Sequence, residues 1–266
     1  MNKISFIGAG NMARAICLGI TKSSLVSEDS ITIYDKNKSQ FDNFSDKIKK
    51  AENISEAIKV SKYIFVCVKP QNIKDLFDEI DADLLKNKII ITICAGITIK
   101  TYENRFGDIK VIRAMPNTPL LIGYGVCALC KNSNVLPHEF GFVKSIFESS
   151  GCVTELDEDK IDAITAVTSS SPAYVYLFIK AMYEGAKKIG IDKEDTISLI
   201  CKTLIGSANM VLQSEKDIDE LIRMVKSPNG TTEKALDVFE NSDFIKIVSD
   251  AMTACKERAT ELSKLN

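Results

Sequence analysis

Short apolar runs alternate with amphipathic stretches through the first half of the chain. The runs are rich in isoleucine and valine, which is typical of buried strands, and the stretches between them repeat apolar residues at helical spacing. The predicted strands are 3–7, 31–34, 63–68, 89–93, 110–114 and 126–130. The predicted helices are 13–23, 38–48, 54–59, 73–80, 99–106 and 138–149. This alternation predicts an α/β domain with a mostly parallel sheet.

After the acidic stretch from Glu155 to Asp162 the strand signals stop, and only helical patterns follow. Ser171 and Pro172 predict the start of a long, apolar, buried helix that ends at Gly190. Further helices are expected from Asp192 to 213, over 218–226 and 231–240, and, with Ser242 as its cap, to 262. We therefore expect an α/β domain over 1–157 and an all-α domain over 158–266. Helices this apolar favour a homo-oligomer that pairs through them.

The composition limits the class of protein further. The chain has 266 residues, of which 45% are hydrophobic, and this is enough for two well-buried cores. Its 34 basic and 36 acidic residues are spread along the whole sequence, so no part has the basic excess that nucleic-acid binding needs. No apolar run reaches the length of a membrane span. We expect a soluble cytoplasmic protein without a nucleic-acid or membrane partner.

Most of the eight cysteines lie inside apolar patterns, as small buried side chains do. Cys127 and Cys130 form one CxxC pair, which leaves metal binding or redox chemistry as an alternative to packing. The chain has no second CxxC and a single histidine, His138, so it lacks the ligands of a tetrahedral zinc site. We expect reduced thiols and no metal.

A glycine loop follows the first predicted strand. Gly8 allows a tight turn, Gly10 lets the backbone approach a pyrophosphate, and Ala13 lets the next helix pack closely. The amides from Asn11 to Ala13 then face the phosphates at the helix start. The loop therefore predicts a Rossmann domain that binds a dinucleotide, the alternative being a tight turn without a ligand.

The end of the second strand bears on the choice of cofactor. Asp35 favours NADH, because an acidic residue here accepts a hydrogen bond from the ribose 2′-hydroxyl. Lys36 and Lys38 follow it and favour NADPH, because they would neutralise a 2′-phosphate. Asp35 is also compatible with a simple turn cap. The sequence leaves NADP or NAD as the cofactor.

Three further loops follow predicted strands, at the edge of the sheet where ligands bind in α/β folds. They are Val68-Lys69-Pro70, Ala95-Gly96 and the loop from Met115 to Pro119. Lys69 precedes a proline and Asn117 lies between two, so both are placed to meet the nicotinamide end. Such loops also commonly serve only to end strands.

The segment from Ser227 to Thr232 predicts an anion-binding turn, which we call the hook. Gly230 and Thr231 would present unpaired amides at a helix start, and Ser227, Thr231 and Thr232 add hydroxyl groups, enough to hold a carboxylate. An ordinary helix cap explains the same pattern. His138 lies apart from these loops, which disfavours a histidine acid. An imine needs only a hydride and a polar donor such as Thr232, because it enters already protonated.

Taken in order, these motifs resemble pyrroline-5-carboxylate reductase, which reduces the cyclic imine 1-pyrroline-5-carboxylate to proline with NAD(P)H. The resemblance runs from the glycine loop through Val68–Pro70, Arg113–Pro119 and Ser169–Tyr174 to the hook. It implies an N-terminal Rossmann domain and an all-α C-terminal domain that forms a dimer, in some members within a decamer. The family often has Gly-Gly where this chain has Asn229-Gly230, and often an uncharged residue at Asp35.

The resemblance also implies residue roles. The implied nucleotide contacts are Ile7, Gly8, Ala9, Gly10, Asn11, Met12, Asp35, Asn53, Cys67, Val68, Lys69, Pro70, Cys94, Ala95 and Gly96. The implied substrate pocket is Val225, Ser227, Gly230, Thr231 and Thr232, with Thr232 donating to the ring nitrogen and Glu215 nearby. The alternatives are another Rossmann imine or hydroxyacid reductase and a non-catalytic NAD(P)-sensing protein. Hydroxyacid enzymes carry a lysine on the central helix, but Lys180 lacks the motif around it.

Overall fold

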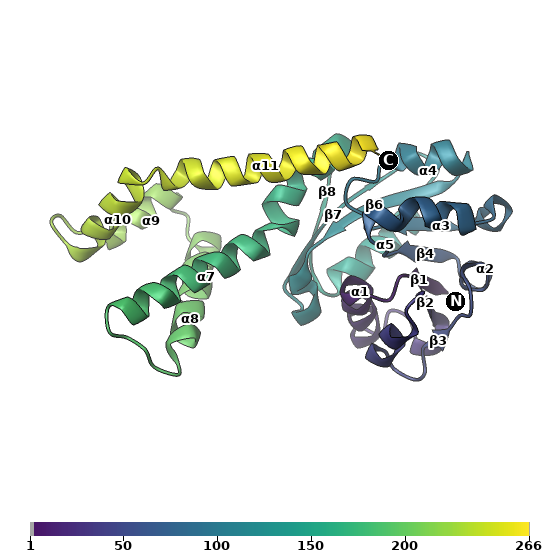
Figure 1. Ribbon diagram of the computed structural model, residues 1–266, viewed down its shortest axis with the longest axis horizontal. Helices are drawn as coiled ribbons and strands as arrows, with labels where there is room; N and C mark the ends of the chain where they lie inside the picture. The colour runs from purple at the N-terminus through teal and green to yellow at the C-terminus, as the bar shows by residue number, and fades with distance from the viewer. Residues whose placement is uncertain (1–2, 266) are drawn as a thin grey trace. The chain divides into compact units, whose positions relative to one another are not determined.

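The computed structural model describes residues 3–265 and divides into two compact units (Figure 1). The first unit contains the residues up to Pro172 and those from Ala254 onward, and the second runs from Ala173 to Thr253. The first unit extends past the expected boundary at 157/158, because the acidic segment that follows is tied to the sheet.

The first unit is built on one eight-stranded sheet of order β3-β2-β1-β4-β5-β6-β7-β8. The strands are β1 (Ile4–Ile7), β2 (Ile31–Tyr34), β3 (Lys49–Lys50), β4 (Tyr63–Val66), β5 (Ile89–Thr92), β6 (Lys110–Pro116), β7 (Gly125–Lys131) and β8 (Gly151–Glu155). All neighbouring strands are parallel except β6 and β7. The six predicted strands and the mostly parallel sheet are confirmed.

The sequence missed the two edge strands, β3 and β8. Both β3 residues are exposed, and β8 has no fully buried residue. Backbone pairing with a neighbouring strand holds an edge strand in place, and it leaves little hydrophobic pattern to detect.

The first unit's helices are α1 (Asn11–Lys22), α2 (Ile54–Lys59), α3 (Ile73–Glu79), α4 (Ile99–Phe106), α5 (Pro137–Glu148) and α6 (Ile161–Ile164). The predicted helix over 38–48 is wrong, because only a 3₁₀ helix forms at Lys38–Asn43. Side chains there bond to the local backbone instead: Asn43 donates to the Gln40 carbonyl, and the Ser45 hydroxyl accepts from the Lys47 amide. Such bonds compete with a regular helix.

The core of the first unit lies in two layers, one on each face of the sheet. Helices α1 and α5 cover the layer that contains Phe6 and Phe65, whose rings stack 4.9 Å apart. Helices α2, α3 and α4 cover the other layer. Cys127 belongs to the first layer and Cys130 to the second, since an odd spacing along a strand places side chains on opposite faces. The CxxC pair therefore packs in the core, and its thiols do not converge on one metal ion.

The buried Arg113 side chain ties the acidic segment to the sheet. Its guanidinium is 1% exposed and lies 2.7 Å from a carboxylate oxygen of Asp162 on α6. Asp162 also accepts a hydrogen bond of 2.9 Å from Ser263 on α11 (Phe244–Leu265). Glu158 lies 3.4 Å from Arg113 and accepts from the Ile99 amide at the start of α4. These bonds join strand β6 to both the acidic segment and the last helix.

The second unit is wholly helical, as expected. Its helices are α7 (Ser171–Lys188), α8 (Thr196–Gln213), α9 (Ile218–Val225), α10 (Thr231–Asn241) and the first part of α11. Three predicted caps are wrong. Asp195 precedes α8 in place of Asp192, and Ser242 ends α10 by donating its amide to the Val238 carbonyl. Ser171 lies inside a continuous helical run, because a π-turn at Thr165–Ser169 leads into α7.

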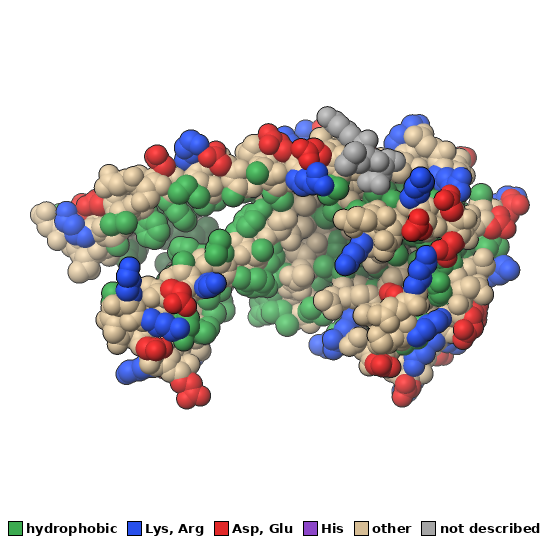
Figure 2. All heavy atoms as spheres, in the orientation of Figure 1, with side chains coloured by type: hydrophobic (Ala, Val, Ile, Leu, Met, Phe, Trp, Pro, Cys, Tyr) green, Lys and Arg blue, Asp and Glu red, His purple; other side chains and the backbone are tan. Residues whose placement is uncertain are grey.

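Helix α7 was expected to be buried, but within this single chain none of its residues is. Tyr176 and Leu177 are 59% and 68% exposed, and Leu212 on α8 and Ile245 on α11 are more than 80% exposed. Figure 2 shows apolar side chains gathered over these helices. Much of the apolar surface of the second unit is therefore not covered by the described residues of its own chain. Over the described residues, no helix is long and apolar enough to cross a membrane.

Candidate functional site

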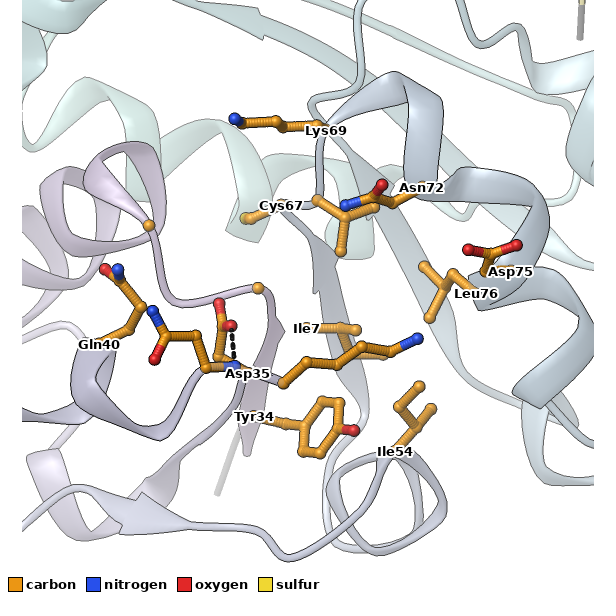
Figure 3. Close-up of a pocket in the computed structure, with 15 residues that line it drawn as sticks. Ile7, Tyr34, Asp35, Gln40, Ile54, Cys67, Lys69, Asn72, Asp75 and Leu76 are labelled. Atoms are coloured by element: carbon orange, nitrogen blue, oxygen red, sulfur yellow. Dashed lines mark hydrogen bonds between the residues drawn. The ribbon is translucent and has the colours of Figure 1, made fainter.

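A cleft of about 480 Å³ opens where strands β1, β2 and β4 end (Figure 3). Eight of the residues predicted to bind the cofactor line it: Ile7, Gly8, Gly10, Asp35, Lys36, Cys67, Val68 and Lys69. The sequence missed seven other lining residues: Tyr34, Asn37, Gln40, Ile54, Asn72, Asp75 and Leu76. No motif marks these seven, because they come from separate segments: the end of β2 and the residues after it, the start of α2, and the segment that leads into and begins α3.

Gly8 has the conformation that the tight turn requires. Its φ is +97°, and a β-carbon there would lie 2.7 Å from the Cys67 carbonyl oxygen. Its amide donates to the Tyr34 carbonyl at 2.8 Å, which joins the loop to the end of β2. Only glycine combines this φ with so close an approach of two backbones.

Gly10 faces open space, since nothing lies within 4 Å of the position that its β-carbon would take. It precedes α1, whose start receives no side-chain cap. The first amides of the helix, beginning with those of Asn11 and Met12, thus keep their donor capacity for an anion. The loop fits a pyrophosphate.

Asp35 fastens the glycine loop. One carboxylate oxygen accepts from the Ala9 amide at 2.7 Å, and the other accepts from the Asn37 amide at 2.8 Å. The side chain therefore caps a turn, which was one of the two predicted roles, and it also lines the cleft. Lys36 forms an ion pair of 2.6 Å with Glu79 on α3.

The loop after β4 carries Lys69 with φ −67° and ψ 145°, the extended conformation predicted from the following Pro70. The Cys94 thiol donates to the Val68 carbonyl at 3.2 Å and so joins this loop to the end of β5. Burial raises the pKa of the Cys94 thiol to about 11 and that of Cys67 well above its ordinary value. Both thiols are therefore protonated near neutral pH.

Three residues predicted as cofactor contacts have structural roles. The Asn53 side chain caps α2 by accepting from the Glu56 amide at 2.9 Å. Gly96 has φ +73°, and a β-carbon there would lie 2.6 Å from the Leu262 side chain. Asn117 is 6% exposed, accepts from the Val126 amide and donates to the Thr168 carbonyl. None of the three lines the cleft, and neither do Ala9, Asn11, Met12, Pro70, Cys94 or Ala95.

The hook lies in the second unit, at the start of α10. Asn229 has φ 56°, and Gly230 donates its amide to the Ser227 carbonyl at 2.9 Å. The expectation that Gly230 presents a free amide is therefore wrong, because the turn uses it. Gly230 instead makes room, since a β-carbon there would lie 2.2 Å from the Ser227 hydroxyl oxygen.

Helix α10 begins at Thr231 without a side-chain cap, so the amides of Thr231, Thr232 and Glu233 have no partner within the helix. Over the described part of the chain, the hydroxyls of Ser227 and Thr232 have no hydrogen-bond partner either. The Glu233 carboxylate stabilises the turn by accepting from the Asn229 amide at 2.7 Å. The hook thus has hydroxyl and amide donors in one short segment.

The other second-unit positions implied by the resemblance are exposed. Val225 ends α9 and is 68% exposed, and Glu215 lies in the turn between α8 and α9. His138 is exposed in the first turn of α5 and does not line the cleft.

Two family models match the chain. "NADP oxidoreductase coenzyme F420-dependent" matches residues 3–96, and "Pyrroline-5-carboxylate reductase dimerisation" matches residues 158–262. Together with the glycine loop and the cleft, these matches define an NAD(P)H-dependent reductase of the Rossmann class.

The relatives define the family. The chain is 37% identical to the pyrroline-5-carboxylate reductase of Escherichia coli, over 98% of each chain, and 32% identical to pyrroline-5-carboxylate reductase 2 of Bacillus subtilis, over 99% and 96%. A crystal structure of Plasmodium falciparum pyrroline carboxylate reductase with NADP bound matches with a TM-score of 0.92 and 30% identity over 98% of each chain. The chain belongs to the pyrroline-5-carboxylate reductase family.

Proposed function

We propose that this protein reduces 1-pyrroline-5-carboxylate to L-proline, the last step of proline biosynthesis. NAD(P)H, when bound, supplies the hydride that adds to the imine carbon. The hook carries the proposal, because its uncapped helix start and its hydroxyl groups are donors that suit a carboxylate substrate. Full-length similarity to proteins named for this activity supports the same substrate.

The first unit would hold the dinucleotide along the cleft. The amides at the start of α1 would bind the pyrophosphate, since Gly10 leaves that approach open. The apolar side chains of Tyr34, Ile54 and Leu76 would contact the adenine, and Asp35 would accept from the ribose. Asn53, Cys94, Ala95, Gly96 and Asn117 do not line the cleft, and they stay predictions as contacts.

The hook would hold the substrate. The Ser227 hydroxyl and the Thr231 amide would bind the carboxylate. The Thr232 hydroxyl would accept from the N–H of the iminium and donate to the lone pair that forms on the ring nitrogen as hydride adds. Val225 and Glu215 both precede this segment in sequence and are proposed to complete the pocket. Because the imine carries its own proton as the iminium, catalysis consists chiefly of holding two reactants in a reactive orientation.

The chain would act as a homo-oligomer. The exposed apolar faces of α7, α8 and α11 are what a dimer interface requires, and the family model for dimerisation covers these helices. We propose a dimer through the C-terminal helices, with a decamer as a further assembly. All eight cysteines are free, which fits the reducing cytoplasm.

The direct test follows the loss of absorbance of NADH and of NADPH with 1-pyrroline-5-carboxylate, and identifies L-proline as the product. Absence of turnover with both cofactors would refute the proposal. The matched control substrate is 1-pyrroline, which lacks the carboxylate. We expect its kcat/KM to be about a hundredfold lower, because the hook then has no anion to bind. Equal rates would instead indicate a general imine reductase.

A further inference from the structure

The carboxylate of Asp35 is fixed in one orientation. The Ala9 and Asn37 amides, at 2.7 and 2.8 Å, each bond to a different oxygen (the second bond is drawn in Figure 3). Ala9 is 1% exposed, so turning Asp35 away would leave a buried amide without a partner. A carboxylate oxygen has two acceptor directions, so each oxygen can still accept one more hydrogen bond.

The lysine beside Asp35 does not offset its charge. Lys36 pairs with Glu79 at 2.6 Å, and this hydrogen bond and charge raise the pKa of Lys36 above its ordinary value. Asp75 lines the same cleft from α3, on the side opposite Gln40 in Figure 3. The ammonium of Lys36 is therefore paired with Glu79, and Asp75 adds a second carboxylate to the cleft.

The second lysine after β2 is also engaged. The Lys38 ammonium lies 5.4 Å from the centre of the Tyr34 ring and 5.1 Å from that of Phe41. It donates to the Ala51 carbonyl at 3.5 Å and lies 4.0 Å from Glu52. Lys38 does not line the cleft. Lys69, the other lysine of the cleft, comes from the loop after β4, across the cleft from Asp35 in Figure 3.

We propose that this reductase uses NADH in preference to NADPH, with Asp35 as the residue that decides. Its fixed carboxylate accepts from the ribose hydroxyls of NADH and repels the 2′-phosphate of NADPH. The inference rests on the proposed reductase function and deepens it. It separates this chain from the Plasmodium falciparum relative, whose crystal structure has NADP bound.

The test measures the dissociation constants of NADH and NADPH for the full chain, together with kcat/KM for each. We expect NADH to bind at least about tenfold more tightly. The Asp35→Asn variant keeps the size and one acceptor oxygen but removes the charge. It should bind NADPH about tenfold more tightly than the wild type does and lose part of its NADH affinity. Thermal unfolding checks that the glycine loop stays intact.

A second pair of variants tests the role of Lys36. Glu79→Gln frees its ammonium from the ion pair and should raise NADPH affinity severalfold, with NADH affinity unchanged. Glu52→Gln removes an exposed carboxylate 4.0 Å from Lys38 and should change neither affinity.

The outcomes separate the two proposals. Tighter binding of NADPH by the wild type, or an unchanged ratio in Asp35→Asn, would overturn the preference for NADH. A clear NADH preference without reduction of the imine would leave this inference standing and overturn the proposed function alone. If neither nucleotide binds, both fail.

Discussion

The carbonyl oxygen of Cys67 lies 2.7 Å from the position that a β-carbon on residue 8 would occupy. Two backbone segments, the glycine loop after β1 and the loop after β4, approach each other at this point. The atoms nearest to that position are backbone atoms of Cys67 and Val68, which cannot move aside as the end of a flexible side chain can. The dinucleotide cleft therefore depends on the absence of a single atom at Gly8.

Gly8→Ala should impair both stability and nucleotide binding. Alanine at φ +97° is strained by about 1–3 kcal/mol, and its methyl group would displace the Cys67 backbone. Chemical denaturation should show a lower free energy of unfolding, and titration should show weaker NADH binding.

Gly10→Ala is the matched variant, since nothing lies within 4 Å of the position that its β-carbon would take. It should unfold like the wild type but bind NADH at least about tenfold more weakly, because the methyl fills the pyrophosphate approach. Equal stability of the two variants would contradict this account.

Thr232→Ala should lose rate and keep nucleotide affinity. Removing one donor to a reacting group commonly lowers kcat by about a hundredfold. Steady-state kinetics give kcat, and titration with NADH gives the affinity of the first unit. Thr232→Ser keeps the hydroxyl and should retain most of the activity. Full activity of the alanine variant would show that Thr232 is not the donor.

Asn117→Ala should destabilise the first unit more than it weakens NADH binding. Its amide accepts from the Val126 amide at 2.8 Å and donates to the Thr168 carbonyl at 3.0 Å, so the variant leaves two backbone groups unpaired. We expect a loss of about 1–3 kcal/mol in the free energy of unfolding. Asn117→Asp keeps the acceptor for Val126 and should lose less. A large drop in NADH affinity with unchanged stability would contradict the bridging role and show that Asn117 acts as the cofactor contact predicted from the sequence.

Glu139→Gln should destabilise the fold at neutral pH. The Glu139 side chain is 3% exposed and lies 2.8 Å from Lys110 and 3.2 Å from Lys62. Removing its charge leaves both lysines without their partner, at a cost of about 2 kcal/mol. Glu155→Gln, which breaks a more exposed pair with Lys144, is the control and should change little.

The same carboxyl predicts a pH dependence. Burial acts to raise the pKa of Glu139, but hydrogen bonds from Lys110, from the Leu136 amide and from Lys62 outweigh it and lower the pKa below its ordinary 4.5. The stabilisation is therefore fully present above about pH 4.5 and is lost as the pH falls through the lowered pKa. Denaturation curves of wild type and Glu139→Gln should converge in acid. A constant difference across this range would contradict the assignment.

Strands and helices that bury one face were predictable, because hydrophobic periodicity reports burial directly. The predicted bounds of α2 and α4 match the structure, whereas the predicted helix over 38–48 failed where polar side chains bond to the backbone. The sequence did not predict the edge strand β8, because this strand is held by backbone pairing with β7, and backbone groups carry no sequence signal.

The glycine loop and the hook could be located from sequence, because each depends on residue types within one short segment. Gly8, Gly10 and Thr232 belong to this group. Roles that depend on residues far apart in the chain could not be predicted from the sequence. Asp35 meets the Ala9 amide across 26 positions, and Asn117 meets Thr168 across 51. Local chemistry thus determined the class of cofactor, and the order of the motifs gave the substrate through the family resemblance. The folding of distant segments together decided what each polar group bonds to, because a hydrogen bond depends on distance in space and not along the chain.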